Sequence, residues 1–175
     1  MVTLSVLAIL AGAAAPSLRD LILNIRMTGQ ANDLMADLAM ARSEASKRNV
    51  RVSLCTSSNG TSCTTSAWQQ GWLVFIDQGA TPNGSLDTGE TVLKVANAFQ
   101  TGNTMSATGA FTAAAGNAYI SYRPSGVTTP GGSNVLFTMC DSRTTASVGA
   151  PAAQNRGRRI TINSTGRAAV ARYTC

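Results

Sequence analysis

The stretch MVTLSVLAILAGAAAPSLRDLILNIRM, residues 1–27, decides the fold. Its first fifteen residues carry no charge. The next apolar side chains recur at the i, i+3, i+4, i+7 spacing of one helix face: Leu18, Leu21, Ile22 and Ile25. Fifteen uncharged residues fall short of the ~20 that cross a bilayer, and a signal peptide would begin with basic residues. We therefore expect a helix that is apolar on all sides and lies in lipid or among other helices.

The helical pattern continues beyond residue 27 with a different character. After a slip near Gly29, an apolar stripe follows one helix face: Leu34, Leu38, Ala41 and Ala45. Charged side chains take the other faces, so residues 28–48 are expected to pack on a domain by one face. Since no strong stop precedes Asn49, the sequence predicts one helix of about 48 residues and roughly 70 Å. Pro16 and Gly29 are expected to kink or loosen it.

Beyond Asn49 the pattern changes to short strands separated by turn-rich loops. Alternating or apolar runs predict strands at 50–54, 72–76, 91–95, 118–122, 135–139, 159–163 and 168–173. The expected fold class is α+β, with a long, half-hydrophobic N-terminal helix packed on an antiparallel β-domain. We divide the chain into a hydrophobic helix half, residues 1–27, and a globular domain, residues 28–175, whose β-domain begins at residue 49.

Four cysteines indicate two disulfides made in an oxidising compartment: Cys55, Cys63, Cys140 and Cys175. No C-x-x-C pair is present, which disfavours zinc and thioredoxin-like sites. Three pairings are possible, and short loops favour Cys55 with Cys63 and Cys140 with Cys175. Four reduced thiols are the competing interpretation, but the Ser, Thr, Asn and Gly residues between Cys55 and Cys63 are typical of an exposed loop.

The net charge of +6 lies entirely in the C-terminal part of the chain. Residues 1–100 hold equal numbers of acidic and basic side chains, whereas residues 101–175 hold seven arginines against Asp141 alone. Five arginines stand near the C-terminus: Arg156, Arg158, Arg159, Arg167 and Arg172. A one-sided basic field favours anionic partners such as nucleic acid or lipid headgroups. The alternative is that arginine only solubilises a β-surface.

The last predicted hairpin, residues 159–173, suits contacts to a DNA backbone better than reading of bases. Strand alternation places Arg159 on the outer face, opposite Ile160 and Ile162, which are expected in the core. Three to five arginines can hold phosphates through salt-sensitive contacts. Tyr173 is the only aromatic residue there that could stack on a single strand.

The sequence contains no convincing catalytic constellation. The chain has no histidine, so Ser/His/Asp and Cys/His arrangements are excluded, as is the commonest metal ligand. Glu44 and Glu90 are the only glutamates, and neither pairs with a second carboxylate. The loop 77–90 has the composition of a calcium loop without its ligand spacing. We therefore expect no enzyme activity, no cofactor, no metal site and no small-molecule substrate.

Four segments together resemble the type IV pilins and type II secretion pseudopilins. The apolar helix with Pro16 is similar to the start of a mature pilin. ARSEASKR, residues 41–48, is similar to the helix end of FimT/FimU-like minor pilins and GspH-like pseudopilins. GWLVFIDQG, residues 71–79, resembles a strand and loop of that subfamily, and Gly166–Arg167 resembles its last hairpin. The chain is thus identified as a member of this family, with a type IV pilin-like fold.

The resemblance implies a structural role without catalysis. A FimT/FimU-like minor pilin primes assembly of a type IV pilus and lies at or near its tip, whereas a GspH-like pseudopilin serves type II secretion. The helix would anchor the protein in the bacterial inner membrane as a single pass, with the domain in the periplasm. It would then pack against the major pilin and other minor pilins in the extracellular pilus. The side chains expected in these contacts are Leu4, Leu7, Ile9, Leu10, Pro16, Leu18, Leu21 and Ile22.

In this family the mature chain opens with a methylated phenylalanine and a stretch like F-T-L-I-E-L. The sequence here is expected to begin just after that stretch. With about six residues restored, the apolar run reaches the ~20 needed to cross a membrane.

The resemblance also implies an alternative function, DNA uptake in natural transformation. Some FimT-like members bind DNA through a C-terminal G-R-x-R motif. Gly166 and Arg167 match its first half, whereas Ala169 stands where the second arginine would be. DNA binding by the five C-terminal arginines therefore stays open beside the pilus and the secretion roles.

Overall fold

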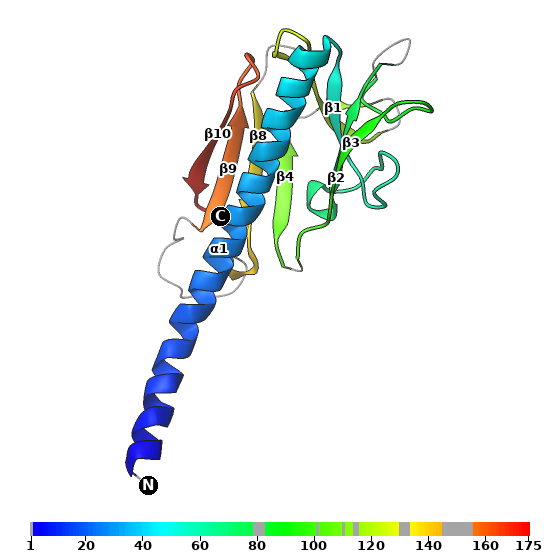
Figure 1. Ribbon diagram of the computed structural model, residues 1–175. Coiled ribbons are helices and arrows are strands. Elements are labelled where there is room, and N and C mark those ends of the chain that lie inside the picture. The colour runs from blue at the N-terminus through cyan, green and yellow to red at the C-terminus, as the bar shows by residue number, and fades with distance from the viewer. Residues whose placement is uncertain are drawn as a thin grey trace.

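Helix α1 (Val2–Arg48) is one uninterrupted helix that neither Pro16 nor Gly29 ends. In the computed structural model, it runs across the β-domain, and its N-terminal half stands clear of the strands (Figure 1). The structure describes residues 2–78, 83–100, 102–109, 111–113, 116–129, 134–144 and 156–175, with the backbone alone for residues 2–17, Phe111 and Thr144. The single long helix predicted from the sequence is confirmed. Within the described residues, no helix combines the length and the apolar character needed to cross a membrane.

One face of helix α1 supplies the centre of the core. The side chains on this face are at most 1% exposed: Met27, Ala31, Leu34, Leu38, Ala41 and Ala45. Their alternating spacing of four and three residues keeps them on one stripe. They belong to the core cluster that also includes residues of both sheets. Burying a leucine in this way stabilises the fold by about 2 kcal/mol, so this face joins the helix to the domain.

The strands form two antiparallel sheets, and helix α1 contacts both of them. The larger sheet has the order β3-β2-β1-β6-β5, with β7 beside β6. Its strands are β1 (Val52–Thr56), β2 (Trp72–Ile76), β3 (Val92–Ala96), β5 (Phe111–Thr112), β6 (Ala118–Tyr122) and β7 (Thr128–Thr129). The smaller sheet has the order β10-β9-β8-β4. Its strands are β4 (Thr104–Thr108), β8 (Val135–Cys140), β9 (Gly157–Ile162) and β10 (Ala168–Tyr173).

Two short 3-10 helices complete the described elements, η1 (Trp68–Gln70) and η2 (Ser142–Thr144). The α+β class and the antiparallel β-domain predicted from the sequence are confirmed. Strands β2, β6 and β10 have the predicted bounds, and β1, β3, β8 and β9 differ from them by at most two residues at either end.

Strands β4, β5 and β7 are absent from the prediction. Strand β4 reads TMSAT, in which Met105 is the one buried side chain, so its alternation is weak. Strands β5 and β7 have two residues each, which is too short for a period of two to be recognised. Their pairing depends on the neighbouring strands β8 and β6, which the local sequence does not reveal.

A buried carboxylate ties helix α1 to the larger sheet. Asp37 is 1% exposed and accepts a hydrogen bond of 2.9 Å from Trp72 Nε1. It also pairs with the ammonium group of Lys94 on β3. Because a buried charge is stable only when it is paired and hydrogen-bonded, these contacts fix the helix at one place along the sheet.

The two disulfides join the cysteines that short loops favour. Cys55 on β1 is bonded to Cys63, and Cys140 at the end of β8 is bonded to Cys175. Their Cα–Cα separations of 5.6 and 6.0 Å lie in the ordinary range. The second bond fastens the last residue of the sequence to the smaller sheet.

Candidate functional site

Four large apolar side chains of helix α1 lie exposed at the point where the helix leaves the domain. They are Leu18, Leu21, Ile22 and Ile25, with exposed fractions of 58%, 54%, 49% and 63%. A contiguous apolar patch of this kind marks an interaction surface. Three of them belong to the contact set expected from the sequence, and Ile25 extends it. The other expected members, Leu4, Leu7, Ile9, Leu10 and Pro16, belong to the backbone of α1, but their side chains fall outside the description.

Arg143 fastens this part of helix α1 to the β-domain. Its Nη1 donates to Asp20 Oδ1 at 3.1 Å, its Nη2 to Asn24 Oδ1 at 2.9 Å, and its Nε to Asp141 Oδ2 at 2.9 Å. The Arg143 side chain is 11% exposed and that of Asp141 is 1% exposed. Hydrogen bonds to Asp141 and, less strongly, to Asp20 raise the pKa of Arg143 against the opposing effect of burial. Arg143 therefore fixes the direction in which the helix leaves the domain.

Two of the five candidate arginines face the same junction. Arg156 Nη2 lies 3.6 Å from Asp20 Oδ2, and Arg158 Nη2 donates to Thr28 Oγ1 at 2.9 Å. Burial lowers the pKa of Arg158, and the charges of Arg172 and Arg143 lower it further. Arg156 and Arg158 are thus engaged with helix α1.

Arg159 and Arg172 occupy opposite faces of the last hairpin. The Arg159 guanidinium lies 3.9 Å from the centre of the Tyr173 ring. Ile160 and Ile162 are fully buried, so the alternation predicted for β9 is confirmed and Arg159 lies on the outer face. Arg172 is exposed and stands opposite Arg158 in the ladder, on the helix side.

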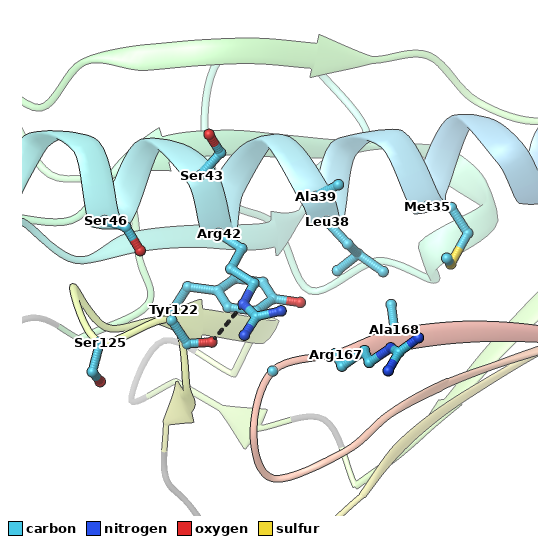
Figure 2. A pocket seen from close by; sticks show the side chains of 12 residues that line it. Met35, Leu38, Ala39, Arg42, Ser43, Ser46, Tyr122, Ser125, Arg167 and Ala168 are labelled. Carbon is cyan, nitrogen blue, oxygen red and sulfur yellow. Dashed lines mark hydrogen bonds between the residues drawn. The ribbon is translucent and has the colours of Figure 1, made fainter.

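Arg167 lies at the other end of β10, about 17 Å along the strand from Arg172. It borders a groove of about 510 Å³ between helix α1 and the turn of the β9–β10 hairpin. Figure 2 shows Met35 and Leu38 on the helix side of this groove and Arg167 on the hairpin side. Arg167 is exposed, and its guanidinium has no hydrogen bond or ion pair among the described residues. The structure therefore does not bring the five candidate arginines into one cluster.

Arg42 holds the end of this groove together (Figure 2). Its Nε donates to the carbonyl of Gly126 at 3.0 Å and its Nη2 to the carbonyl of Thr165 at 3.2 Å. One side chain of α1 thus joins two turns. Gly166 has a φ of 78°, and a Cβ there would lie 2.0 Å from the Gly126 carbonyl oxygen. The turns touch so closely that only glycine fits before Arg167.

Tyr122 lies beneath the groove with an unpaired hydroxyl. The side chain is fully buried, and its hydroxyl has no hydrogen-bond partner in the described part of the chain. Burial raises the pKa of Tyr122 to about 12, while the charge of Arg42 opposes the shift. An unsatisfied buried polar group costs about 1–3 kcal/mol, so this hydroxyl is a feature that packing alone does not explain.

Sequence reasoning missed the roles of Arg42, Tyr122 and Arg143. Arg42 belongs to the ARSEASKR segment, which resembles the family, whereas Arg143 counted in the sequence only as one of the seven arginines of residues 101–175. Tyr122 carried no signal, because an aromatic residue at the end of a strand is ordinary. The contacts of Arg42 and Arg143 join the N-terminal helix to turns and loops in the C-terminal part of the chain, so no local pattern could reveal them.

No metal centre is formed by the residues that the structure describes, where no three possible ligands gather. In the loop 77–90, whose residues 79–82 lie outside the description, Asp77 accepts hydrogen bonds from the backbone of Asn83 at 3.3 Å and Gly84 at 3.1 Å. It also accepts one from the Ser53 hydroxyl at 2.6 Å. This carboxylate organises the turn.

Comparison with known proteins gives a family and similar solved structures. A model of the family described as type II transport protein GspH matches residues 30–166. The type IV minor pilin FimU of Pseudomonas aeruginosa is similar with a TM-score of 0.55 and 18% identity, over 83% of this chain and 87% of that one. The minor pseudopilin EpsH from the type 2 secretion system of Vibrio cholerae has a TM-score of 0.53 and 9% identity, over 84% and 97%. No curated protein matches. At these identities, the solved structures show a shared fold.

Proposed function

This chain belongs to the GspH family, whose members are type IV pilin-like minor pilins and pseudopilins, and on that premise we propose that it is a minor pilin of a type IV pilus. In this role it joins other minor pilins and the major pilin through helix α1, primes assembly, and lies at or near the filament tip. The family is one of structural pilins, so the proposal requires no catalytic site.

The observation that carries the proposal is the exposed apolar surface of helix α1. Leu18, Leu21, Ile22 and Ile25 are about half exposed or more beyond the end of the β-domain. Helices pack by burying such surfaces against each other. We propose residues 1–27 as the assembly segment, which enters the inner membrane before assembly and the filament core after it. Residues 28–175 form the globular domain, which lies in the periplasm and then outside the cell on the filament.

Two features favour a pilus over a type II secretion filament. The chain carries two disulfides, which stabilise a domain that works outside the cell. It is also basic, with a net charge of +6. Deletion of the gene in the native host separates the two roles: loss of surface pili supports the proposal, whereas loss of secreted enzymes with normal pili supports a pseudopilin.

The assembly role is tested by placing a charge on the exposed helix face. We expect Leu21→Glu and Ile25→Glu to abolish recovery of this protein in sheared filaments, because a carboxylate cannot be buried among apolar helices without a partner. The measurement is an immunoblot of the filament fraction from a deletion strain that expresses each variant. Both residues are exposed, so the fold should keep its thermal stability.

Ala36→Glu is the matched control, because Ala36 is exposed on the domain half of the same helix. This variant should enter filaments at the wild-type level. Normal incorporation of Leu21→Glu and Ile25→Glu would contradict an assembly role for this surface.

A second candidate function, DNA binding at the pilus, is favoured by the last hairpin. Arg167 and Arg172 are exposed, Arg159 is partly exposed, and no acidic residue lies in residues 156–175. A strand pair with unneutralised guanidinium groups suits phosphate contacts. Arg156 and Arg158 are weaker candidates, because contacts with helix α1 already engage them.

This second function is tested with the full chain in detergent and a short DNA duplex at two salt concentrations. Changing Arg159, Arg167 and Arg172 together to Gln should weaken binding and reduce the slope of log K against log salt by about one for each lost phosphate contact. The double change of Arg156 and Arg158 to Gln should have a smaller effect. If the duplex does not bind at low salt, or if the triple change has no effect, the hairpin is not a DNA site.

A further inference from the structure

We propose that the groove between helix α1 and the β9–β10 turn binds an acidic side chain of a neighbouring subunit, presented on a short segment beside an apolar residue. This inference rests on the proposed function for the existence of a neighbour. Its test needs no filament, so either proposal can fail without the other.

The charge of the groove calls for an anion. Arg42 and Arg167 line it, and none of the described residues that line it is acidic. Arg42 uses Nε and Nη2 on two backbone carbonyls and keeps Nη1 without a partner among the described residues, while Arg167 keeps its whole guanidinium. A free guanidinium binds a carboxylate through two parallel hydrogen bonds.

The Tyr122 hydroxyl beneath the groove is a hydrogen-bond donor without an acceptor among the described residues. The Tyr122 hydroxyl is buried and, in the part of the chain that the structure describes, unpaired, and Arg42 is close enough for its charge to affect this group. A carboxylate held by Arg42 and Arg167 would supply the missing acceptor once the atoms that cover this hydroxyl shift aside. This requirement distinguishes the groove from an ordinary basic surface.

The remaining walls favour an acidic side chain on a peptide over a phosphate backbone. Met35, Leu38 and Ala168 line the groove beside the two arginines (Figure 2). Of these, Met35 and Ala168 are partly exposed, and they suit an aliphatic neighbour of the acidic residue, whereas a DNA backbone would leave them uncovered. The volume of about 510 Å³ lies within the ordinary range of binding pockets.

The groove is preformed, which reduces the entropy lost on binding. Arg42 braces the turns at Gly126 and Thr165, and Gly166 brings those turns into direct contact. Neither turn has to move for Arg167 to meet a ligand.

The test is a titration of the full chain, held in detergent micelles, with a fluorescent peptide whose ends are blocked. The peptide is Gly-Ala-Leu-Glu-Leu-Gly, and its matched partner has Gln in place of Glu. Fluorescence anisotropy should show binding of the Glu peptide and at least about tenfold weaker binding of the Gln peptide, the loss expected for a charge-assisted hydrogen bond.

Three variants locate the site. Arg167→Gln should weaken binding of the Glu peptide about tenfold, and Tyr122→Phe about threefold, because the second change removes a neutral hydrogen bond. Lys47→Gln is the control: it removes one positive charge from an exposed position on helix α1 outside the groove, and binding should not change.

Several results would overturn the proposal. They are the absence of binding at millimolar peptide, equal binding of the Gln peptide, and an equal loss with Lys47→Gln and Arg167→Gln. Displacement of the peptide by a short DNA duplex would show that the groove is a phosphate site instead. Unchanged binding in Tyr122→Phe would remove the hydroxyl from the site and with it the argument from the unpaired donor.

Discussion

At the scale of the residue, Gly166 shows how one position serves both the fold and the groove. Its φ of 78° is strained for any residue with a Cβ, and the Gly126 carbonyl leaves no space for one. The sequence predicted only a hairpin over residues 159–173, with a turn between its two strands. The contact that makes this glycine necessary joins two separate turns, one at Gly126 and one at Gly166, and has no local signal.

Gly166→Ala should lower the free energy of unfolding by about 2 kcal/mol or more, because strain in the left-handed region adds to a backbone clash. Gly89→Ala is the matched control, since Gly89 has a φ of 92° and nothing within 4 Å of an added Cβ. Urea unfolding of both variants separates the backbone strain, which both share, from the clash with Gly126, which only Gly166→Ala has. An equal loss in both would show that the clash with Gly126 contributes nothing.

Tyr122 makes the free energy of unfolding depend on pH in the alkaline range. Its folded-state pKa of about 12 lies above the ordinary value of 10, so the folded state keeps its proton where the unfolded state loses it. The contribution of this group to the free energy of unfolding is fully present below pH 10 and falls as the pH rises from 10 to 12. At pH 11 the loss should be about 1 kcal/mol relative to pH 8.

Tyr122→Phe is the test of this linkage. The variant should lack this part of the pH dependence and should be at least as stable as the wild type at pH 8, because it removes an unsatisfied buried hydroxyl. Urea unfolding of both proteins at pH 8 and pH 11 measures the difference. Parallel losses in the two proteins would contradict the assignment to Tyr122.

At the scale of the element, helix α1 contacts the domain in two ways, of which the sequence predicted one. Its buried stripe in residues 28–48 follows from periodicity, and the structure confirms it. Its attachment at Asp20 and Asn24 does not, because these polar residues resemble any solvated helix surface in the sequence. Their partner, Arg143, follows strand β8 near the other end of the chain, so only the closed fold brings the three together.

Arg143→Gln should lower the free energy of unfolding by about 3 kcal/mol, because it removes the positive charge that is paired with Asp141, whose side chain is 1% exposed. Asp20→Asn changes only the half-exposed partner of Arg143 and should lower the free energy of unfolding by less than about 1 kcal/mol. Both variants should also speed hydrogen exchange of the backbone near residue 20 by freeing the helix from the domain. Equal stability of the two variants would contradict the conclusion that Arg143 stabilises the fold mainly through Asp141.

At the scale of the whole molecule, two disulfides stabilise a domain whose core is shared between one helix and two sheets. The loop between Cys140 and Cys175 spans 35 residues and includes the last hairpin, whereas the loop between Cys55 and Cys63 spans eight. Closing the longer loop removes more entropy from the unfolded chain.

Replacing Cys140 and Cys175 together by Ala should therefore lower the free energy of unfolding by about 4 kcal/mol, against about 2.5 kcal/mol for Cys55 and Cys63. Urea unfolding of the two double variants tests this order. A reversed order would indicate that local structure around Cys55 and Cys63, and not loop entropy, sets their contribution.

The sequence by itself determined the elements whose signal is local. Period 3.6 specified helix α1, period 2 specified most strands, and cysteine spacing favoured both disulfides. The same patterns supported the family and its fold, because a long apolar helix followed by these strand and turn motifs is typical of it. These features depend on neighbouring residues, which one stretch of sequence contains in full.

The tertiary structure alone decided where the charges lie relative to each other. Five arginines that form one group in the sequence separate into Arg156 and Arg158 against helix α1, Arg159 over Tyr173, Arg172 opposite Arg158, and Arg167 beside a groove. The physical reason is that strand alternation and the length of β10 send side chains to opposite faces and ends. The helix that Arg156 and Arg158 meet belongs to the opposite end of the chain, and only the packing of this helix across both sheets brings it to them.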